Sequence, residues 1–380
     1  DPVLRAQVHR DGAPAHATPR LDPTTAMSTN ALDARLLLAK VSAVVRAGGA
    51  EPRPAPGFGL GAAVVDAADA PWVLLAHDPV HAVGPALAWA RKHSLAPLHL
   101  LVDDPADAAV VARRAAAFDP APTVWLALPT GPVAVEAGAP VRPHDVPSPE
   151  AELFAALFRE LDLDLVVEHG VVTAEWLGLE VGRLVPAEVD GDPGSSRLVL
   201  RVGVGHIDQI AGEVVNHDVT DSDALASAAA IVRRHRRADA VPHPLTQLVP
   251  ERWLRRVVLA HPDLVGATAL EPVAPVPGRR NLRERGVAPL VGRDAAGRDL
   301  VVVCSTGVDL DVIPAAADAR LSHAPGARLV VVLPEGDVHA VTVALAAQLA
   351  EPADLVAIPG DWRALLDVPD RAGAGGGDGG

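Results

Sequence analysis

Short apolar runs alternate with amphipathic stretches in the first half of the chain. Residues 72–76, 98–102 and 123–128 are mostly apolar and have the length of strands, and residues 83–93 and 106–118 have the apolar spacing of helices. Buried strands of a parallel sheet read as nearly continuous apolar runs, whereas apolar residues three and four positions apart indicate a helix. The pattern therefore predicts a β-α-β-α-β unit, which is typical of a Rossmann-like fold.

A helix precedes this unit, and two linkers bound it. Asn30 is a good N-cap for a helix that runs to about Arg46, where a pair of glycines can end it. The apolar positions of this helix are Leu32, Leu36, Leu37, Val41, Val44 and Val45. Proline and glycine are concentrated in residues 52–61 and 140–149, which we expect to be linkers.

The second half of the chain shows the same alternation after a longer and less regular stretch. Strands are predicted at residues 165–168, 197–204, 300–304, 328–333 and 355–358. Helices are predicted at residues 173–184, 222–237, 250–260, 314–321 and 338–349. From residue 300 onward these elements form a second β-α-β-α-β run. The two runs have the same kind of pattern, but no sequence identity supports a duplication.

Together the patterns predict an α/β protein with two βαβ-type halves and mostly parallel sheets. We expect a Rossmann-like domain with its leading helix at residues 28–161 and a second α/β domain at residues 162–368. The second domain would contain a helical, arginine-rich insertion at residues 231–293.

The two ends of the chain lack hydrophobic periodicity. Residues 1–26 precede the only methionine, Met27, so we expect them to be disordered or a non-native extension. Residues 369–380 consist mostly of glycine, and we expect them to form a disordered tail.

Composition narrows the class of protein. Hydrophobic residues make up 49% of the chain, which excludes a disordered polypeptide, and the single cysteine, Cys304, excludes an internal disulfide. No apolar run approaches the roughly 20 residues of a membrane helix, and no signal peptide opens the chain. These features predict a cytoplasmic protein without membrane contact, and the excess of Arg over Lys indicates a bacterial origin.

Charge is segregated along the chain. Residues 231–293 contain twelve arginines and five acidic residues, a net charge of +7 in a chain of −15. Such a segment is expected where a protein meets an anion such as a phosphate backbone. The candidate contacts are Arg233, Arg234, Arg236, Arg237, Arg279, Arg280 and Arg283. Alternatively, these arginines are solvated or paired with acids of the same protein. The chain has few aromatic residues to stack on single-stranded bases.

A second candidate site follows the apolar run at residues 300–304. Ser305, Thr306 and Gly307 form a small polar turn there, and Asp309 and Asp311 follow it. Ligands of open α/β sheets bind beyond the carboxyl ends of strands, so this turn could hold an anion, and the two aspartates a metal or a hydroxyl. In the alternative interpretation, Asp311 caps the next helix and the turn has no ligand.

One further group of residues is a weaker candidate, and Cys304 is not a candidate. His206, Asp208, Glu213, His217 and Asp218 could bind a divalent cation, although they lack a recognised ligand spacing and could equally be polar residues at a strand end. Cys304 is expected to be a small buried hydrophobic residue, not a nucleophile.

Residues 176–306 resemble the PD-(D/E)XK nuclease fold, in which an acidic helix precedes an Asp strand and a strand bearing Glu-x-Lys. Glu180 matches the helix acid, Asp208 the strand aspartate, and residues 297–306 the third motif. A Rossmann-like domain ahead of such a nuclease resembles the layout of CRISPR-associated Rossmann-type effectors. The second acid and the lysine are replaced by Val303 and Ser305, so the resemblance implies a catalytically degenerate nuclease-like domain.

Three functions follow from these observations. The first is a nucleic-acid-associated protein with a degenerate nuclease-like domain, in which Glu180, Asp208, Asp309 and Asp311 are the candidate catalytic carboxylates. The second is an enzyme or binding protein for a small anionic metabolite or nucleotide at the turn between Cys304 and Asp311. The third is a non-catalytic interaction protein. The sequence predicts no particular cofactor and no oligomeric state.

Overall fold

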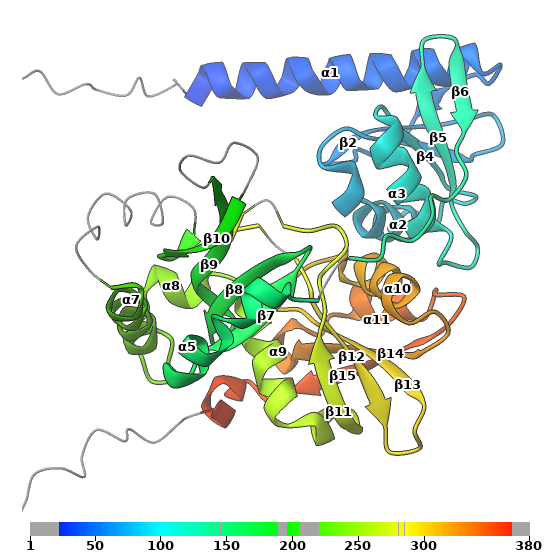
Figure 1. Cartoon of the computed structure of the whole chain (residues 1–380). Helices are drawn as coiled ribbons and strands as arrows, with labels where there is room; N and C mark the ends of the chain where they lie inside the picture. The colour runs from blue at the N-terminus through cyan, green and yellow to red at the C-terminus, as the bar shows by residue number, and fades with distance from the viewer. Residues whose placement is uncertain are drawn as a thin grey trace, which may run out of the picture.

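A computed structural model describes residues 23–143, 146–188, 196–205, 220–279, 281–284 and 286–366, without the side chains of residues 23–32. It shows a mixed α/β protein with three sheets, of six, four and five strands (Figure 1). Within these ranges, no helix is long and apolar enough to cross a membrane.

The N-terminal sheet contains the predicted β-α-β-α-β unit. Its strands β3, β4 and β5 are parallel neighbours, and the strands on either side of them are antiparallel. The strands are β1 (Arg53–Pro54), β2 (Gly61–Val65), β3 (Pro71–Leu75), β4 (His99–Val102), β5 (Thr123–Leu128) and β6 (Gly131–Ala134). Helices α2 (Val83–Lys92) and α3 (Pro105–Ala115) cover one face. Helix α1 (Pro23–Ala47) buries Val41, Val44 and Val45 against the other face.

The middle sheet is entirely antiparallel and corrects the expectation of two mostly parallel halves. It consists of β7 (Asp164–Glu168), β8 (Val171–Trp176), β9 (Leu179–Glu188) and β10 (Ser196–Val202) in a meander. The helix predicted at residues 173–184 is wrong, because Leu177 and Gly178 both have positive φ and form a two-residue hairpin turn between β8 and β9. Helices α4 (Pro149–Glu152) and α5 (Ala155–Glu160) precede the sheet, and α7 (Asp221–His235) and α8 (Pro244–Gln247) follow it.

The C-terminal sheet carries the second predicted run. Its order is β11-β12-β13-β14-β15, with β13, β14 and β15 parallel. The strands are β11 (Ala267–Pro272), β12 (Ala288–Asp294), β13 (Asp299–Cys304), β14 (Arg328–Pro334) and β15 (Ala353–Ile358), and the helices are α9 (Pro250–Ala260), α10 (Val312–His323) and α11 (Ala340–Ala346). The expected insertion at residues 231–293 is therefore not an insertion. It contains the end of α7, all of α8 and α9, and the first two strands of this sheet.

The N-terminal and C-terminal sheets share one architecture. In each, a helix and two antiparallel strands lead into three parallel strands connected by two helices. The registers agree relative to one aspartate in each hairpin turn, Asp66 or Asp294. In each repeat the residue five positions before this aspartate pairs with the residue nine positions after it, Gly61 with Leu75 and Pro289 with Val303. Each hairpin turn is closed by an aspartate, Asp66 or Asp294, whose side chain accepts hydrogen bonds from the backbone two and four residues ahead. The chain thus contains a structural repeat of low sequence similarity.

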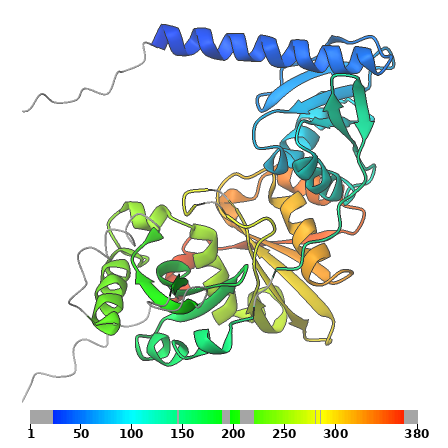
Figure 2. The ribbon, with the colours of Figure 1, turned by 45° about the horizontal axis from the view of Figure 1, so that its top comes forward.

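The two repeats pack through their helices. Helices α2 and α3 of the first face α10 and α11 of the second, between the two sheets (Figures 1 and 2). Phe118 and Leu349, which precede β5 and β15 in their own repeats, pair as an isolated antiparallel bridge across this layer. At its centre, Arg113 and Arg114 of α3 form buried ion pairs with Asp318 of α10, and Arg114 also pairs with Asp311.

The backbones of the two repeats also approach closely at Gly84. Its N–H donates to the carboxylate of Asp311 at 3.2 Å, and a Cβ at this position would lie 1.8 Å from the carbonyl oxygen of Leu310. Only glycine allows the first turn of α2 to lie this close to the turn before α10.

We predict that Gly84→Ala lowers the free energy of unfolding by about 3 kcal/mol, because the backbone must move to relieve the overlap. Gly59→Ala is the matched control, since a Cβ there meets no atom within 4 Å. Urea denaturation of both variants measures the difference. Equal stability of the two variants would show that the repeats are not packed this closely.

Candidate functional site

The arginine-rich segment does not form one outward-facing surface. Arg236, its most buried member, has no exposed surface, and its guanidinium donates to the carbonyls of Leu177, Leu245, Leu248 and Val249. Burial lowers the pKa of Arg236 to about 9, and the carboxylate of Glu251 opposes this shift. Arg236 is therefore a structural residue, and its expected contact with an anion is wrong.

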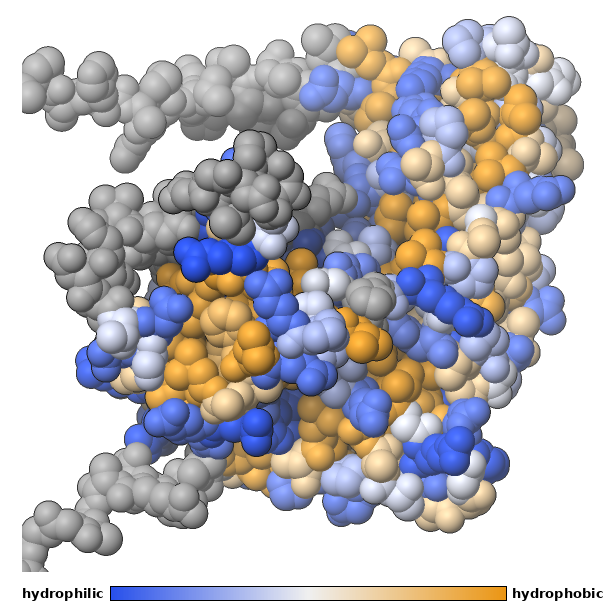
Figure 3. All heavy atoms as spheres, in the orientation of Figure 1, coloured by the Kyte–Doolittle hydropathy of each residue, from blue (hydrophilic) through white to orange (hydrophobic). Residues whose placement is uncertain are grey.

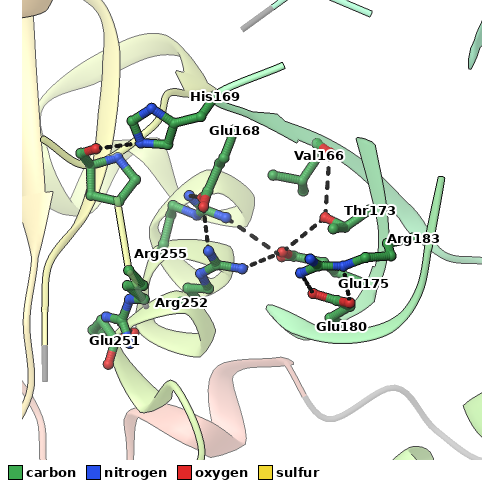
Figure 4. A network of polar contacts seen from close by, with 12 residues as sticks. Val166, Glu168, His169, Thr173, Glu175, Glu180, Arg183, Glu251, Arg252 and Arg255 are labelled. Carbon is green, nitrogen blue, oxygen red and sulfur yellow. Dashed lines mark hydrogen bonds and ion pairs between the residues drawn. The ribbon is translucent and has the colours of Figure 1, made fainter. Parts of the chain in front are cut away.

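Two arginines of α9 are paired with acids of the middle sheet (Figure 4). Arg252 contacts Glu168 and donates to Glu175 at 2.7 Å. Arg255 donates to the same two carboxylates at 2.9 and 3.5 Å. This network attaches the middle sheet to the C-terminal repeat.

Other candidate arginines also have partners within the chain. Arg233 donates to the carbonyl of Leu161 and lies over the ring of Trp176, Arg237 pairs with Asp239, and Arg279 pairs with Glu251. Arg234 and Arg283 are exposed, and Arg280 lies outside the described residues. On the face shown in Figure 3, hydrophilic residues are spread among hydrophobic ones.

The candidate catalytic carboxylates occupy different environments. Glu180 lies on strand β9, not on a helix, and its carboxylate accepts two hydrogen bonds of 2.7 Å from Arg183 (Figure 4). Asp208, like the neighbouring group from His206 to Asp218, lies outside the described residues. Cys304 is fully buried, and burial raises the pKa of its thiol, as expected for a core residue.

The turn after β13 is not an open anion site. The N–H of Ser305 donates to the carbonyl of Val332, and the N–H of Gly307 donates to the carboxylate of Asp337 at 2.7 Å. Thr306 is half-buried between them. Because two backbone donors of this turn are already used, the expected anion contact through them is wrong.

Asp309 and Asp311 belong to the interface between the repeats. Asp309 accepts a hydrogen bond from the N–H of Asp311 at 2.9 Å. Asp311 precedes α10, but its side chain does not cap that helix and instead accepts from Arg114 at 2.6 Å and from Gly84. Burial raises the pKa of Asp311 to about 6, with Arg114 opposing the shift and Asp309 adding to it.

One loop is hydrogen-bonded to both repeats and to the hairpin turn between β7 and β8 of the middle sheet. The carbonyls of Ala274, Pro275 and Val276 accept hydrogen bonds from His323 of α10, His169 of the β7–β8 turn and Arg114 of α3, at 2.8, 2.9 and 2.9 Å respectively. We call residues 274–276 the strap. Three parts of the molecule therefore meet at three consecutive peptide groups.

A charged cavity lies beside the strap. It is lined by Pro275 and Val276 of the strap and by Arg279 and Glu284 of the loop that follows it. Arg114 of α3, His81 from the segment after β3, and Asp309 and Asp311 from the segment after β13 complete its charged lining. The space that the centre of a water molecule can occupy in it measures about 20 Å³, within a hollow of about 400 Å³ that includes open solvent. The cavity therefore has room for about one water molecule or ion.

Three side chains at or next to this cavity have the chemistry of metal ligands, and two of them, His81 and Glu284, line it. Asp78 and His81 come from the turn after β3, and Glu284 comes from the loop before β12. One ligand atom of each lies within 4.8 Å of the others, and Nδ1 of His81 is 3.0 Å from the carboxylate of Asp78. Sequence reasoning missed this group, because about two hundred positions separate Asp78 and His81 from Glu284 and no local spacing connects them.

Comparisons with known proteins add no relative. No protein-family model, no curated protein and no solved structure matches the chain.

The network in Figure 4 shifts the pKa values of two glutamates in opposite directions. Burial raises the pKa of Glu175, and the nearby Glu168 and Glu180 add to the shift beyond what Arg252 and Arg255 offset. Burial also disfavours ionised Glu168, but the charges of Arg252 and Arg255 outweigh it and lower the pKa.

These shifts predict opposite pH dependences for two isosteric variants. Ionised Glu168 stabilises the fold above its ordinary pKa of 4.5, and this contribution is lost as the pH falls. Glu168→Gln should therefore lower the free energy of unfolding by about 3–5 kcal/mol at pH 7 and by less in acid. Glu175 stabilises the fold most below pH 4.5, and this stabilisation is lost as the pH rises because its pKa is raised. Glu175→Gln should therefore lower the free energy of unfolding by less as the pH rises. Urea denaturation between pH 4 and 8 measures both slopes, and slopes of the same sign would contradict the assignment.

Proposed function

We propose that the chain is a binding protein for a small anionic ligand, whose anionic group binds at the cavity between its two α/β repeats. The observation that carries the proposal is the convergence of charged side chains from three separate segments on one cavity: residues 78–81, residues 279–284 and residues 309–311. Two of these segments follow the carboxyl ends of β3 and β13, where ligands of α/β sheets bind. The cavity also lies at an interface between repeats, a common place for ligand sites.

Arg279 supports an anionic ligand. Its side chain is 8% exposed and lines the cavity. Among the described residues, its Nε is buried and has no hydrogen-bond partner. A buried guanidinium nitrogen without an acceptor is unfavourable, and a carboxylate or phosphate oxygen of a ligand would satisfy it.

A nucleic-acid-associated protein with a degenerate nuclease-like domain is the second candidate. It is supported by the order of elements α9, β11, β12, β13, α10 and β14, in which a helix with the buried acid Glu251 precedes the strand that ends at Cys304. Val303 and Ser305 leave this strand without the acid and lysine of the resemblance. Because most candidate arginines have internal partners, this function ranks below the first.

Thermal-shift measurements with phosphate, nucleotides and dicarboxylates test the proposal. A ligand at one hundred times its Kd should stabilise the protein by about 2.7 kcal/mol. We expect Asp309→Asn to raise the affinity for the anion at least tenfold, because it removes a negative charge from the cavity wall. Asp361→Asn, an exposed control beyond β15, should leave the affinity unchanged.

Binding that is identical in wild type and Asp309→Asn would place the ligand elsewhere. A short DNA or RNA belongs in the same panel. Nucleic-acid binding that weakens steeply with added salt and is unchanged in Asp309→Asn would favour the second candidate.

A further inference from the structure

We propose that Asp78, His81 and Glu284 bind one divalent cation, which carries the anionic ligand into the cavity. The inference rests on the proposed function, because it explains how an anion can bind among carboxylates. Glu284, Asp309 and Asp311 line the cavity beside Arg114 and Arg279. A cation held between the carboxylates and the ligand would give the anion a positive partner in addition to these arginines.

The distances suit coordination of one ion. Carboxylate and imidazole ligands lie about 2.0–2.6 Å from a divalent metal, so two ligand atoms on one ion are separated by roughly 3–4.5 Å. The ligand atoms of Asp78, His81 and Glu284 lie within 4.8 Å of one another, which requires only small side-chain movements. The adjoining cavity has room for about one water molecule or ion.

The local backbone holds two of the ligands in place. Asp78 has a φ of 49° and stands directly before the short helix Pro79–His81. This turn brings the Asp78 carboxylate to His81 Nδ1 at 3.0 Å. A bound ion would lie between the Asp78 carboxylate and the His81 imidazole and replace this hydrogen bond, so that both side chains are ligands.

The ligand set indicates the class of metal. One imidazole and two carboxylates favour Mn²⁺, Fe²⁺ or Zn²⁺ over Ca²⁺, whose ligands are usually all oxygen. Three protein ligands leave coordination positions open for water or for an oxygen of the anion. The ion would also connect the first repeat, which supplies Asp78 and His81, to the loop that supplies Glu284.

Isothermal titration of the EDTA-treated full chain with Mn²⁺, together with electron paramagnetic resonance to count bound ions, tests the site. We expect one bound ion per chain in wild type and at least a tenfold weaker affinity in His81→Ala and in Glu284→Gln. His77→Ala is the matched control, because His77 is exposed in the same turn and is not one of the three ligands, so it should bind like wild type.

No bound ion, or an affinity that is unchanged in both ligand variants, would overturn the cation site. The second result would assign the ion to another part of the chain. Circular dichroism of each variant establishes that it is folded. Titrating an anion from the ligand panel with and without EDTA separates the two proposals. Anion binding that persists in EDTA supports the proposed function and rejects the cation site as its carrier. Mn²⁺ binding that is lost in His81→Ala, with no anion bound by any variant, supports the cation site and rejects the proposed function.

Discussion

Three consecutive backbone carbonyls, those of Ala274, Pro275 and Val276, organise this molecule. Each accepts a hydrogen bond from a different unit: the C-terminal repeat, the middle sheet and the N-terminal repeat. A buried carbonyl that loses its donor costs about 1–3 kcal/mol, so each unit stabilises the same short strap. The residues that follow the strap then bring Arg279 and Glu284 to the cavity. The position of the cavity is thus a consequence of how the sheets are joined.

The segregated positive charge has a structural explanation. Arg252 and Arg255 lie on α9, and their acidic partners Glu168 and Glu175 lie on the middle sheet, about eighty positions earlier in the chain. Buried ion pairs of this kind add little net stability compared with apolar packing, but the loss of one partner is costly. They therefore fix which surfaces of the two units meet. A charge block that looks like a binding surface along the chain is here mostly an internal contact.

The elements with continuous apolar runs could be predicted, and those that depend on turns could not. Strands β3 and β13 are buried on both faces, so their sequences alone identify them. The segment from Thr173 to Leu184 has apolar residues that also fit a helix, and the left-handed turn at Leu177 and Gly178 decides for a hairpin. The sequence shows the same alternation in both halves but no identity between them, because the repeat consists of strand order and register, which many apolar sequences satisfy.

The site was only partly predictable for a related reason. The turn after β13 is a plausible ligand site by its chemistry, yet the N–H groups of Ser305 and Gly307 have partners from distant loops. Asp78 and Glu284 are separated by about two hundred residues, and only the packing of the two repeats places them together. Periodicity and spacing report on local structure, whereas this cavity is made of contacts between units.

A double-mutant cycle of His169→Ala and His323→Ala tests the role of the strap most directly. The two histidines belong to different units and bind neighbouring carbonyls, at Pro275 and Ala274. If the strap is the shared connection, their effects on the free energy of unfolding should be coupled by about 0.5–3 kcal/mol. Effects that add within about 0.5 kcal/mol would show that the two units are held independently, and would contradict this account.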